Sequence, residues 1–384
     1  MRLTRVELTD FRGYREAQVS LPSGVSTLLG PNGHGKTNLV EAVGYAATLA
    51  SHRVAGDAPL IRHGCERAVI RAEVVRDARA TLLELEIVSG RANRARLNTS
   101  PLSRQRDVLG TVRTVLFAPE DLALVKSDPA ERRRFTDDLL VARQPRWQGV
   151  RQDYDKALKQ RNALLKSQRQ LRSGRSEDAA TLAVFDTHLA QVGAALTYAR
   201  LRLLRDLEPL VQQAYAAISD AETTVAATYR PSWAQAMKAP SGQDPVPSAG
   251  DIEQAMMQSM QEWATLERER GVSLVGPHRD EVALTLGAMP ARGYASHGES
   301  WSIALALRLA SFHLLRRDLG TDPVLILDDV FAELDTGRRE RLASMVTDAE
   351  QVLVTAAVAG DVPALLGEAA VFDVRDQSVT ARSA

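Results

Sequence analysis

Apolar and polar positions alternate over short stretches of the first 120 residues, with the period of two that is typical of β-strands. The predicted strands lie within residues 2–29, which hold two strands joined by a turn at 21–24, and at 67–75, 81–88, 94–98 and 112–117. A helix is predicted from Asn38 to Ala50, where apolar residues recur at helical spacing. The pattern therefore predicts a mixed, β-rich lobe with this helix at its centre.

The period changes to that of helices at Asp128-Pro129-Ala130-Glu131, a sequence typical of a capping box with proline in the first turn. From Leu182 to Leu203, apolar residues recur in alternating steps of three and four. An earlier apolar series, from Tyr154 to Leu171, is expected to pack against it across a turn near Ser173-Gly174. We expect an antiparallel helical hairpin whose second helix kinks or ends at Pro209.

Strand and helix patterns alternate again in the last part of the chain. The predicted strands are 222–230, 282–286, 324–327 and 351–355, and the predicted helices are 251–270, 300–317 and 336–347. The alternation over the last hundred residues is typical of an α/β nucleotide-binding core. We therefore divide the chain into a head formed by residues 1–122 and 221–384 and a helical insert at residues 123–220.

Composition narrows the function classes. Among 384 residues, 48 Lys plus Arg balance 48 Asp plus Glu, so any nucleic-acid site must be a local basic patch. The single cysteine, Cys65, excludes an intramolecular disulfide and a cysteine zinc site, and fits a reducing cytosol. The charged first ten residues and the lack of a run of 18 apolar residues predict a cytoplasmic protein without a membrane segment.

A glycine-rich loop between a predicted strand and a predicted helix matches the P-loop pattern. It consists of Gly30, Pro31, Asn32, Gly33, His34, Gly35, Lys36 and Thr37. The N–H groups of such a loop and the N-terminus of the following helix attract phosphate. Lys36 is expected to contact the β- and γ-phosphates, and Thr37 to ligate Mg²⁺. The loop predicts a nucleotide-binding site.

A second half of that site is predicted at the end of the strand at 324–327, where Asp328 and Asp329 follow. In a P-loop ATPase the first acid holds Mg²⁺ and the second is placed to orient the attacking water. Lys36 and Asp328 lie 292 positions apart, much further than in GTPases, small kinases and transporter ATPase subunits. Such an insertion is characteristic of the SMC-like branch of the ABC ATPases. Their signature matches Ser296-His297-Gly298, which opens a predicted helix.

Four segments, in this order, resemble the RecF family of bacterial DNA replication and repair ATPases. They are residues 30–42, 117–122, 276–280 and 327–335. The resemblance implies an α/β fold, an ABC-type (SMC-like) P-loop ATPase head with an inserted all-helical domain. It also implies ATP and Mg²⁺ as cofactors, sequence-independent DNA binding, an ATP-dependent homodimer, and slow, DNA-stimulated hydrolysis. The implied partners are RecR and, indirectly, RecO and RecA, which is loaded at single-strand gaps and ss/dsDNA junctions during replication repair and the SOS response.

The resemblance also implies roles for single residues. By position it assigns nucleotide binding to residues 30–37, metal binding to Thr37 and Asp328, catalysis to Lys36, Asp328 and Asp329, contacts with the partner's ATP to Ser296 and Gly298, and the D-loop acid to Asp335. Asp329 stands where most ABC ATPases have Glu, and Thr355 lies near where many have a switch histidine. Glu120 falls near the expected Q-loop glutamine. The first two departures suit slow turnover.

Residues 143–175 hold ten basic residues against two acids, an asymmetry that suits the phosphate backbone of DNA. The basic residues are Arg143, Arg146, Arg151, Lys156, Lys159, Arg161, Lys166, Arg169, Arg172 and Arg175. Of these, Lys156, Lys159, Arg161 and Lys166 are the candidate DNA contacts, and a solvated helix face is the alternative. Arg53, Arg62 and His63 are candidates for contacts with DNA or with the γ-phosphate, two roles that the sequence does not separate.

Other functions share parts of the pattern. An SMC-like ATPase subunit of a nuclease or chromosome-maintenance complex is the alternative. No acidic cluster or His/Asp motif of a nuclease domain follows Asp335. The insert at 123–220 is too short for the long coiled coil of a chromosome-organising protein. The motif spacing excludes a transporter ATPase subunit.

Overall fold

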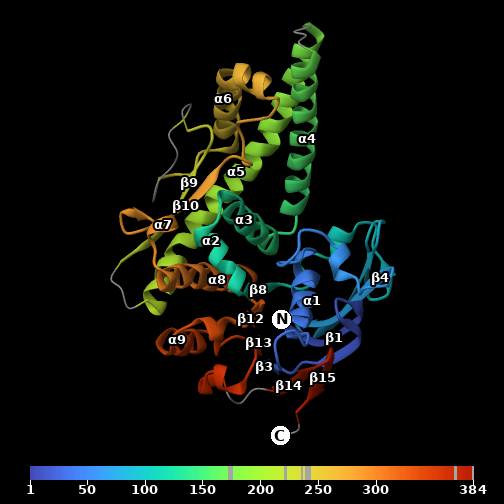
Figure 1. The fold of residues 1–384 in the computed structure, drawn as a ribbon. Helices are drawn as coiled ribbons and strands as arrows, with labels where there is room; N and C mark the ends of the chain where they lie inside the picture. The colour runs from blue at the N-terminus through green and yellow to red at the C-terminus, as the bar shows by residue number, and fades with distance from the viewer. Residues whose placement is uncertain (172–175, 220–222, 235–236, 238–243, 367–369, 383–384) are drawn as a thin grey trace. The chain divides into compact units, whose positions relative to one another are not determined.

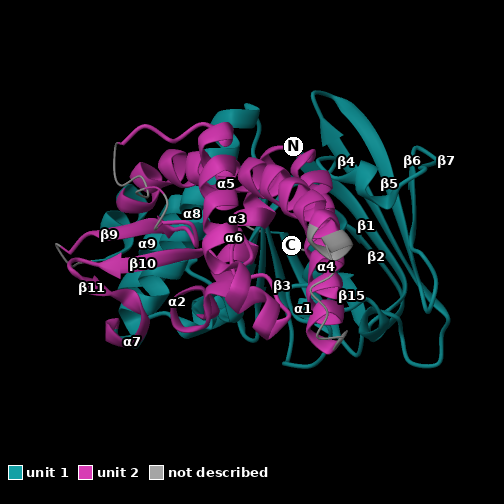
Figure 2. Ribbon diagram, turned by 90° about the horizontal axis from the view of Figure 1, so that it is seen from above, with its two compact units in different colours: residues 1–122, 213–222, 296–384 teal, residues 123–212, 223–295 magenta. Residues whose placement is uncertain are grey.

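The computed structural model describes residues 1–171, 176–219, 223–234, 237, 244–366 and 370–382. Two compact units, each built from separate stretches of the chain, are coloured in Figure 2. Unit 1 comprises residues 1–122, 213–222 and 296–384, and unit 2 comprises residues 123–212 and 223–295. Residues 223–295, which the sequence pattern assigned to the C-terminal part of the head, therefore group with the helical insert.

Six antiparallel strands form the first sheet of unit 1, in the order β2-β1-β4-β5-β6-β7. Their bounds are β1 Arg2–Phe11, β2 Tyr14–Ser20, β4 Arg67–Arg76, β5 Arg79–Val88, β6 Arg94–Leu97 and β7 Ser100–Pro101. The prediction of two strands within residues 2–29 is wrong, because these residues form three strands, β1, β2 and β3 Gly24–Leu29. A tight turn at Arg12-Gly13 separates β1 from β2. Arg12 has a positive φ of 53° there, which the residue type did not indicate.

The second sheet of unit 1 is mainly parallel and has the order β15-β14-β3-β13-β12-β8 (Figure 1). Its strands are β3 Gly24–Leu29, β8 Thr114–Phe117, β12 Val324–Asp328, β13 Gln351–Ala356, β14 Ala370–Arg375 and β15 Ser378–Ala381. β13 lies between β3 and β12, and the three strands are parallel. The loops after β3 and β12 therefore leave the same edge of the sheet, where ligands bind in open α/β sheets.

Three helices of unit 1 lie where the sequence predicted helices. They are α1 Lys36–Thr48, α8 His297–Leu319 and α9 Thr336–Val346. α1 contributes Val40 and Val43 to a hydrophobic core that also includes Leu3 of β1 and Ile326 of β12. The helix that follows the P-loop is thus held between side chains of both sheets, which fixes the position of the loop.

Unit 2 combines helices with an antiparallel sheet of order β11-β10-β9. Its elements are α3 Pro129–Arg143, α4 Trp147–Leu171, β9 Val225–Arg230, α6 Ala249–Arg270, β10 Glu281–Leu286, β11 Met289–Pro290 and α7 Ala291–Tyr294, with most of α2 Leu122–Lys126 and α5 Ser176–Ile218. The described residues of 123–212 are mainly helical, as predicted, whereas β9 and β10, expected in the head, pair with each other here. The predicted turn at Ser173-Gly174 lies outside the described residues.

Two predicted helix ends differ from the structure. Pro129 begins α3 as expected, but Asp128 makes no side-chain capping bond and instead lies 2.9 Å from Arg292. α5 continues through Pro209 to Ile218. Leu207 and Val211 on either side of the proline are each 1% exposed, so apolar packing outweighs the lost backbone bond. Within the described part of the chain, no helix has the length and apolar character needed to cross a bilayer.

Candidate nucleotide-binding site

The loop between β3 and α1 has the backbone geometry that its glycine spacing predicts. Gly33 and Gly35 have φ angles of 85° and 115°, a region that residues with a Cβ rarely adopt. At Gly30 a Cβ would lie 2.0 Å from the carbonyl oxygen of Val374 on β14. Geometry therefore requires glycine at these three positions.

Lys36 lies inside the curve of this loop and is 3% exposed. Its Nζ donates to the carbonyl oxygens of Gly30 and Pro31 at 2.7 and 3.3 Å, and to Oδ1 of Asn32 at 3.2 Å. The ammonium group is thus satisfied by the loop's own neutral oxygens. Phosphate oxygens are charged acceptors and form stronger hydrogen bonds with a cation, so a nucleotide can compete for this group.

Thr37 connects the P-loop with the end of β12. Its Oγ1 donates to Oδ1 of Asp328 at 3.2 Å, although the two residues are 291 positions apart. Burial raises the pKa of Asp328 to about 6, against hydrogen bonds from Thr355 and Thr37 that lower it. Mg²⁺ takes few protein ligands, usually one or two carboxylates beside water and phosphate oxygens. The hydroxyl and the carboxylate therefore fit a nucleotide-bound Mg²⁺.

Thr355 on β13 is hydrogen-bonded to both acids that end β12. Its hydroxyl donates to Oδ1 of Asp328 at 2.7 Å and accepts the backbone N–H of Asp329 at 2.9 Å. Asp329 has a φ of 51°, a conformation that a non-glycine residue keeps only when its surroundings hold it. Thr355, which the sequence placed near the switch position, thus fixes the turn from which the Asp329 side chain leaves.

His52 faces the same carboxylate and was not singled out by the sequence pattern. Its Nε2 lies 4.0 Å from Oδ2 of Asp328. Burial lowers the pKa of His52, against the charges of Glu120 and Glu41, which raise it. Glu120, the Q-loop candidate, is exposed, and its charge also raises the pKa of Asp328. The one signal for His52 is its place in the loop after the P-loop helix.

The sequence left three basic residues between contacts with DNA and contacts with the γ-phosphate, and these residues, Arg53, Arg62 and His63, lie in different surroundings. Nη1 of Arg53 donates to Oδ1 of Asn38 at 3.3 Å, in the first turn of α1. Nε of Arg62 lies 2.7 Å from Oδ1 of Asp10. Arg62 and His63 line a hollow of about 550 Å³ that also includes Asn38. Nη1 of Arg53 also lies 3.8 Å from Oε2 of Glu41 on the same helix, so both arginines have an acidic partner and Arg53 contacts the P-loop helix directly.

The predicted signature turn caps α8. Oγ of Ser296 accepts the N–H of Glu299 at 3.2 Å, and the Glu299 carboxylate accepts the N–H of Ser296 at 2.8 Å. Arg338 of α9 donates to Oγ of Ser302 on α8 at 3.0 Å and forms an ion pair with Asp335. The N-terminal part of the signature helix and the D-loop acid, both candidates for contacts across a dimer, are thereby joined through one arginine.

The structure divides the candidate DNA contacts on α4 into exposed and buried side chains. The exposed ones are Lys156, Lys159 and Lys166. Arg161 is 1% exposed and forms ion pairs with Asp186 of α5 and Glu267 of α6, both at 2.6 Å. The prediction that Arg161 contacts DNA is therefore wrong, because its side chain holds three helices of unit 2 together.

Further basic residues of this segment have acidic partners. Arg143 lies 2.8 Å from Asp206, and Arg151 lies 2.9 Å from Asp138. Arg172 and Arg175 lie outside the described residues. The basic surface that remains for a nucleic acid is thus smaller than the sequence count of ten implied.

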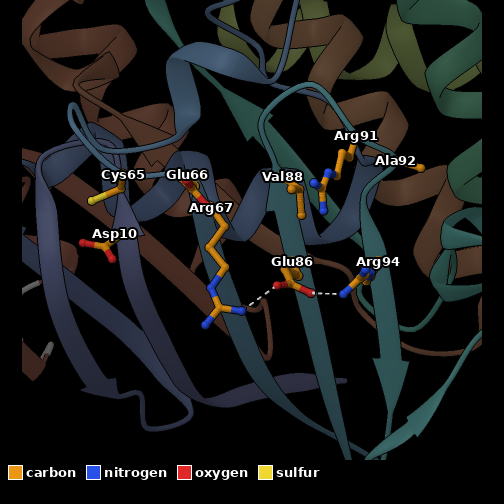
Figure 3. A pocket seen from close by; sticks show the side chains of 9 residues that line it. All are labelled: Asp10, Cys65, Glu66, Arg67, Glu86, Val88, Arg91, Ala92 and Arg94. Carbon is orange, nitrogen blue, oxygen red and sulfur yellow. Dashed lines mark hydrogen bonds and ion pairs between the residues drawn. The ribbon is translucent and has the colours of Figure 1, made fainter.

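A separate hollow of about 440 Å³ opens on the first sheet of unit 1 (Figure 3). Its lining residues are Asp10, Cys65, Glu66, Arg67, Glu86, Val88, Arg91, Ala92 and Arg94. Glu86 lies 2.9 Å from Arg67 and 3.6 Å from Arg94, so one carboxylate offsets two cations. The hollow shares no residue with the predicted nucleotide site, and we assign it no part in nucleotide binding.

Comparisons with known proteins identify the family of this chain. Residues 2–364 match the RecF/RecN/SMC N terminal domain family. The chain is 58% identical to the DNA replication and repair protein RecF of Kineococcus radiotolerans over 95% of each chain. It is 57% identical to the protein of the same name from Streptomyces avermitilis, over 95% of this chain and 96% of that one.

Solved structures of a RecF protein and of an Smc head also resemble this chain. A structure of the recombination mediator protein RecF-ATPrS in the RecFOR pathway superimposes with a TM-score of 0.88 at 26% identity, covering 100% of this chain and 98% of the other. An Smc head bound to the C-winged helix domain of ScpA has a TM-score of 0.55 at 14% identity, covering 100% of this chain and 98% of the other, and shows a shared fold. The predicted SMC-like ATPase head is confirmed, and the chain belongs to the RecF family of DNA replication and repair proteins.

Proposed function

We propose that this chain is an ATP-dependent, DNA-binding recombination mediator in which ATP binding assembles a dimer on DNA and slow hydrolysis releases it. The observation that carries the proposal is the 3.2 Å hydrogen bond between Thr37 and Asp328. It joins the two halves of the proposed ATP·Mg²⁺ site from distant parts of the chain. The structures described as RecF-ATPrS and RecF-ATP, with TM-scores of 0.88 and 0.87, support ATP as the nucleotide.

Each residue of this site has a separate task in the proposal. The N–H groups of residues 30–37 bind the phosphates, and Lys36 adds a positive charge. Thr37 and Asp328 hold Mg²⁺, which neutralises charge on the phosphates when bound. The Asp329 carboxylate accepts a hydrogen bond from the attacking water. Because Asp is one methylene shorter than Glu, its reach toward that water is shorter, which suits slow turnover.

The signature turn supports the proposed dimer. Ser296 and Gly298 lie at the N-terminus of α8, where the helix dipole and N–H groups favour an anion. In the proposed dimer that anion is the γ-phosphate of the partner subunit's ATP. ATP then lies between the two subunits, and its hydrolysis removes a contact that both subunits share.

DNA binding is assigned to the exposed lysines of α4, Lys156, Lys159 and Lys166. They form a local positive surface in a chain with no net charge, which suits contacts with phosphates rather than bases.

We place the dimer with RecR, and through it RecO and RecA, in loading RecA at single-strand gaps and ss/dsDNA junctions during replication repair and the SOS response. This would occur in the cytoplasm at the nucleoid. A solved relative described as a recombination mediator in the RecFOR pathway supports placing the chain in that pathway.

Calorimetric titration with ATP and Mg²⁺ tests the site. Lys36→Ala removes the buried cation and is expected to weaken ATP binding by about 100-fold or more, the effect of truncating one member of a desolvated charge pair. Lys156→Ala makes the same chemical change on the exposed face of α4 and should bind ATP as the wild type does. Equal affinity of the wild type and Lys36→Ala would overturn the proposed site.

A further inference from the structure

The turn between β14 and β15 lies against the P-loop, more than 340 positions away in the sequence. The backbone N–H of Gln377 donates to the carbonyl oxygen of His34 at 3.1 Å. Its side-chain Nε2 donates to the carbonyl oxygen of Gly33 at 3.3 Å. The N–H of Asp376 donates to Nδ1 of His34 at 3.0 Å. Two residues of one turn thus make three hydrogen bonds to two adjacent residues of the loop.

A third carbonyl of the loop, that of Gly35, is held from the β1–β2 side and also accepts the N–H of Leu39 in α1 at 3.1 Å. The hydroxyl of Tyr14, the first residue of β2, donates to the carbonyl oxygen of Gly35 at 3.1 Å. Tyr14 is completely buried, and burial raises its pKa, so the hydroxyl stays protonated and remains a donor. Three successive carbonyls, those of residues 33 to 35, are therefore bonded to groups outside the loop.

The direction of these carbonyls determines the direction of the phosphate-binding groups. In a trans peptide unit the C=O of one residue and the N–H of the next point in opposite directions. Holding the carbonyls of Gly33, His34 and Gly35 therefore fixes the N–H groups of His34, Gly35 and Lys36 on the opposite side of the loop. In this structure the N–H of His34 makes only a long, 3.4 Å bond to Pro31, which a charged phosphate oxygen can replace.

The position of the Gln377 amide is set by close packing. A Cβ on Gly13 would lie 2.6 Å from both Cδ and Oε1 of Gln377, and the three atoms nearest to it all belong to Gln377. A Cβ on Gly35 would lie 2.6 Å from the same Oε1. Asp376 and Gln377 have φ angles of 49° and 60°, which two-residue hairpin turns usually assign to Asn and Gly. The turn keeps this unfavourable conformation where it contacts the P-loop.

We propose that Gln377 and Tyr14 are positioning residues of the nucleotide site, which orient the P-loop N–H groups by holding the carbonyls behind them. The assignment rests on the proposed ATP-binding function and adds residues that the P-loop motif does not contain. In this proposal both residues act through the carbonyls of the loop and not as phosphate-binding groups. Their contribution is preorganisation, because N–H groups already aimed at the phosphates need no reorientation on binding.

Gln377→Glu is the most direct test, because it keeps the shape of the side chain and replaces the donor Nε2 by an acceptor that repels the Gly33 carbonyl. We expect ATP and ADP to bind about 10-fold more weakly, and Gln377→Ala and Tyr14→Phe to bind about 3- to 10-fold more weakly, the range for one net hydrogen bond. Amide hydrogen exchange of residues 33–36 in the nucleotide-free protein should be faster in all three. Ser378→Ala, an exposed change in the adjacent position, should leave both measurements unchanged.

Gly13→Ala supplies a test from the opposite side of the amide. The three atoms nearest to the added methyl all belong to Gln377, so the methyl displaces that side chain and should weaken ATP binding as Gln377→Ala does. In a Gln377→Ala background the same methyl has nothing to displace and should have no further effect. Additive losses in the double variant would contradict the proposal.

Different results would contradict the positioning role of Gln377 and Tyr14 and the nucleotide site itself. If the wild type binds ATP, Lys36→Ala does not, and the Gln377 and Tyr14 variants match the wild type in affinity and hydrogen exchange, the positioning role is wrong and the site stands. If the wild type does not bind ATP, the proposed function fails, and unchanged exchange in the variants would reject the positioning role separately. If Gln377→Glu does not fold, Gln377→Ala and Gly13→Ala decide.

Discussion

The hydroxyl of Thr355 on β13 donates a 2.7 Å hydrogen bond to Oδ1 of Asp328 on the neighbouring strand β12. The same hydroxyl accepts the N–H of Asp329 at 2.9 Å, and Asp328 also accepts a bond from Thr37 of the P-loop. One side chain therefore connects the proposed metal ligand with the proposed base. Residues that hold a metal ligand from behind commonly affect affinity or activity by about 10- to 100-fold.

Thr355→Val should separate hydrolysis from nucleotide binding. Valine has nearly the same shape but neither donates to Asp328 nor accepts from Asp329, so the strained turn at Asp329 loses a restraint. We expect hydrolysis to fall by roughly 10- to 100-fold while the P-loop still binds ATP. Steady-state hydrolysis and calorimetric ATP titration measure the two effects. Thr355→Ser keeps the hydroxyl and should restore the rate, and wild-type turnover in the valine variant would refute the role.

Arg161→Ala should destabilise unit 2 rather than weaken DNA binding directly. The change leaves Glu267, which is completely buried, without its charged partner at 2.6 Å. Breaking a buried pair from one side typically costs about 3–5 kcal/mol of the free energy of unfolding. Urea denaturation measures the loss. Lys159→Ala, two positions earlier and exposed, should change the free energy by less than about 0.5 kcal/mol. A loss below about 1 kcal/mol for Arg161→Ala would show that the pair is not structural.

The combined change of Lys156, Lys159 and Lys166 to Ala tests the exposed DNA surface that remains. Each phosphate contact contributes about 0.9 to the slope of log affinity against log salt, so the slope should become shallower by about 2 to 3. Affinity should fall alike for unrelated sequences, measured by fluorescence anisotropy at several salt concentrations. Changing Arg94 and Arg96 of β6 and Arg91 of the preceding turn to Ala removes equal charge elsewhere and serves as the control. An unchanged slope in the lysine variant would assign DNA binding to another surface.

The parts of the site that sequence predicts are those where chemistry fixes residue type and spacing. The glycines from Gly30 to Gly35 could be recognised because each position excludes a Cβ or needs an unusual φ. Asp328 could be recognised because it ends a buried apolar strand, β12. This strand is parallel to β13 and β3, so its end lies at the same edge of the sheet as the P-loop. Each feature is a short local pattern in the chain. The 292 positions between Lys36 and Asp328 were also informative, because they indicated the SMC-like branch of ABC ATPases.

What the sequence did not predict depends on contacts between distant segments. The bonds from Gln377 to Gly33 and His34 leave no local pattern, and β14 and β15 were not recognised as strands. Arg161 was selected for its charge, although it lies seven residues after Tyr154 and four before Leu165, on the buried face of α4. Helical spacing would have indicated its burial. Charge alone could not, because a buried cation and an exposed one look the same in composition.

His278 should make unit 2 sensitive to acid. Burial lowers the pKa of His278 to about 4, against a hydrogen bond with Ser273 that raises it. The charges of Arg279, Arg133 and Arg161 also lower it. The neutral ring donates from Nε2 to the Ser273 carbonyl and accepts the Tyr154 hydroxyl at Nδ1, at 3.1 and 2.6 Å. A protonated ring could not accept that hydroxyl.

The sign of the effect follows from the two pKa values. Above pH 6.5, the ordinary value, the ring is neutral in both folded and unfolded chains and contributes no pH dependence. Between pH 6.5 and about 4, only the unfolded chain takes up the proton. The free energy of unfolding therefore falls by about 1.4 kcal/mol for each unit by which the pH is lowered. In urea denaturation from pH 7.5 to 5, His278→Gln should lose the contribution of His278 and have a shallower slope than the wild type, although other buried histidines such as His52 still contribute. His63→Gln, at an exposed position, should keep the wild-type slope. Parallel slopes for His278→Gln and the wild type would contradict the assignment.

Ser296→Arg should separate ATP binding from dimerisation. The P-loop, Thr37 and Asp328 are unchanged in this variant, so one subunit should still bind ATP. The arginine side chain at the start of α8 would occupy the space of the partner's γ-phosphate and prevent association. Sedimentation velocity with ATP and Mg²⁺ should show a dimer for the wild type and a monomer for Ser296→Arg. Asp329→Asn, which retains the binding residues but lacks the proposed base, should remain a dimer longer than the wild type.

Mixing Ser296→Arg with Lys36→Ala gives the sharper test of sites shared between subunits. In the mixed dimer, one site combines both defects, and the other combines an intact P-loop with an intact signature turn. If each site takes its P-loop from one subunit and its signature from the other, the mixture should recover up to about half of the wild-type hydrolysis per dimer. Each variant alone should have almost none, because both of its sites carry a defect. If the mixture is as inactive as either variant, and Ser296→Arg alone still dimerises with ATP, then the signature turn does not contact the partner's nucleotide.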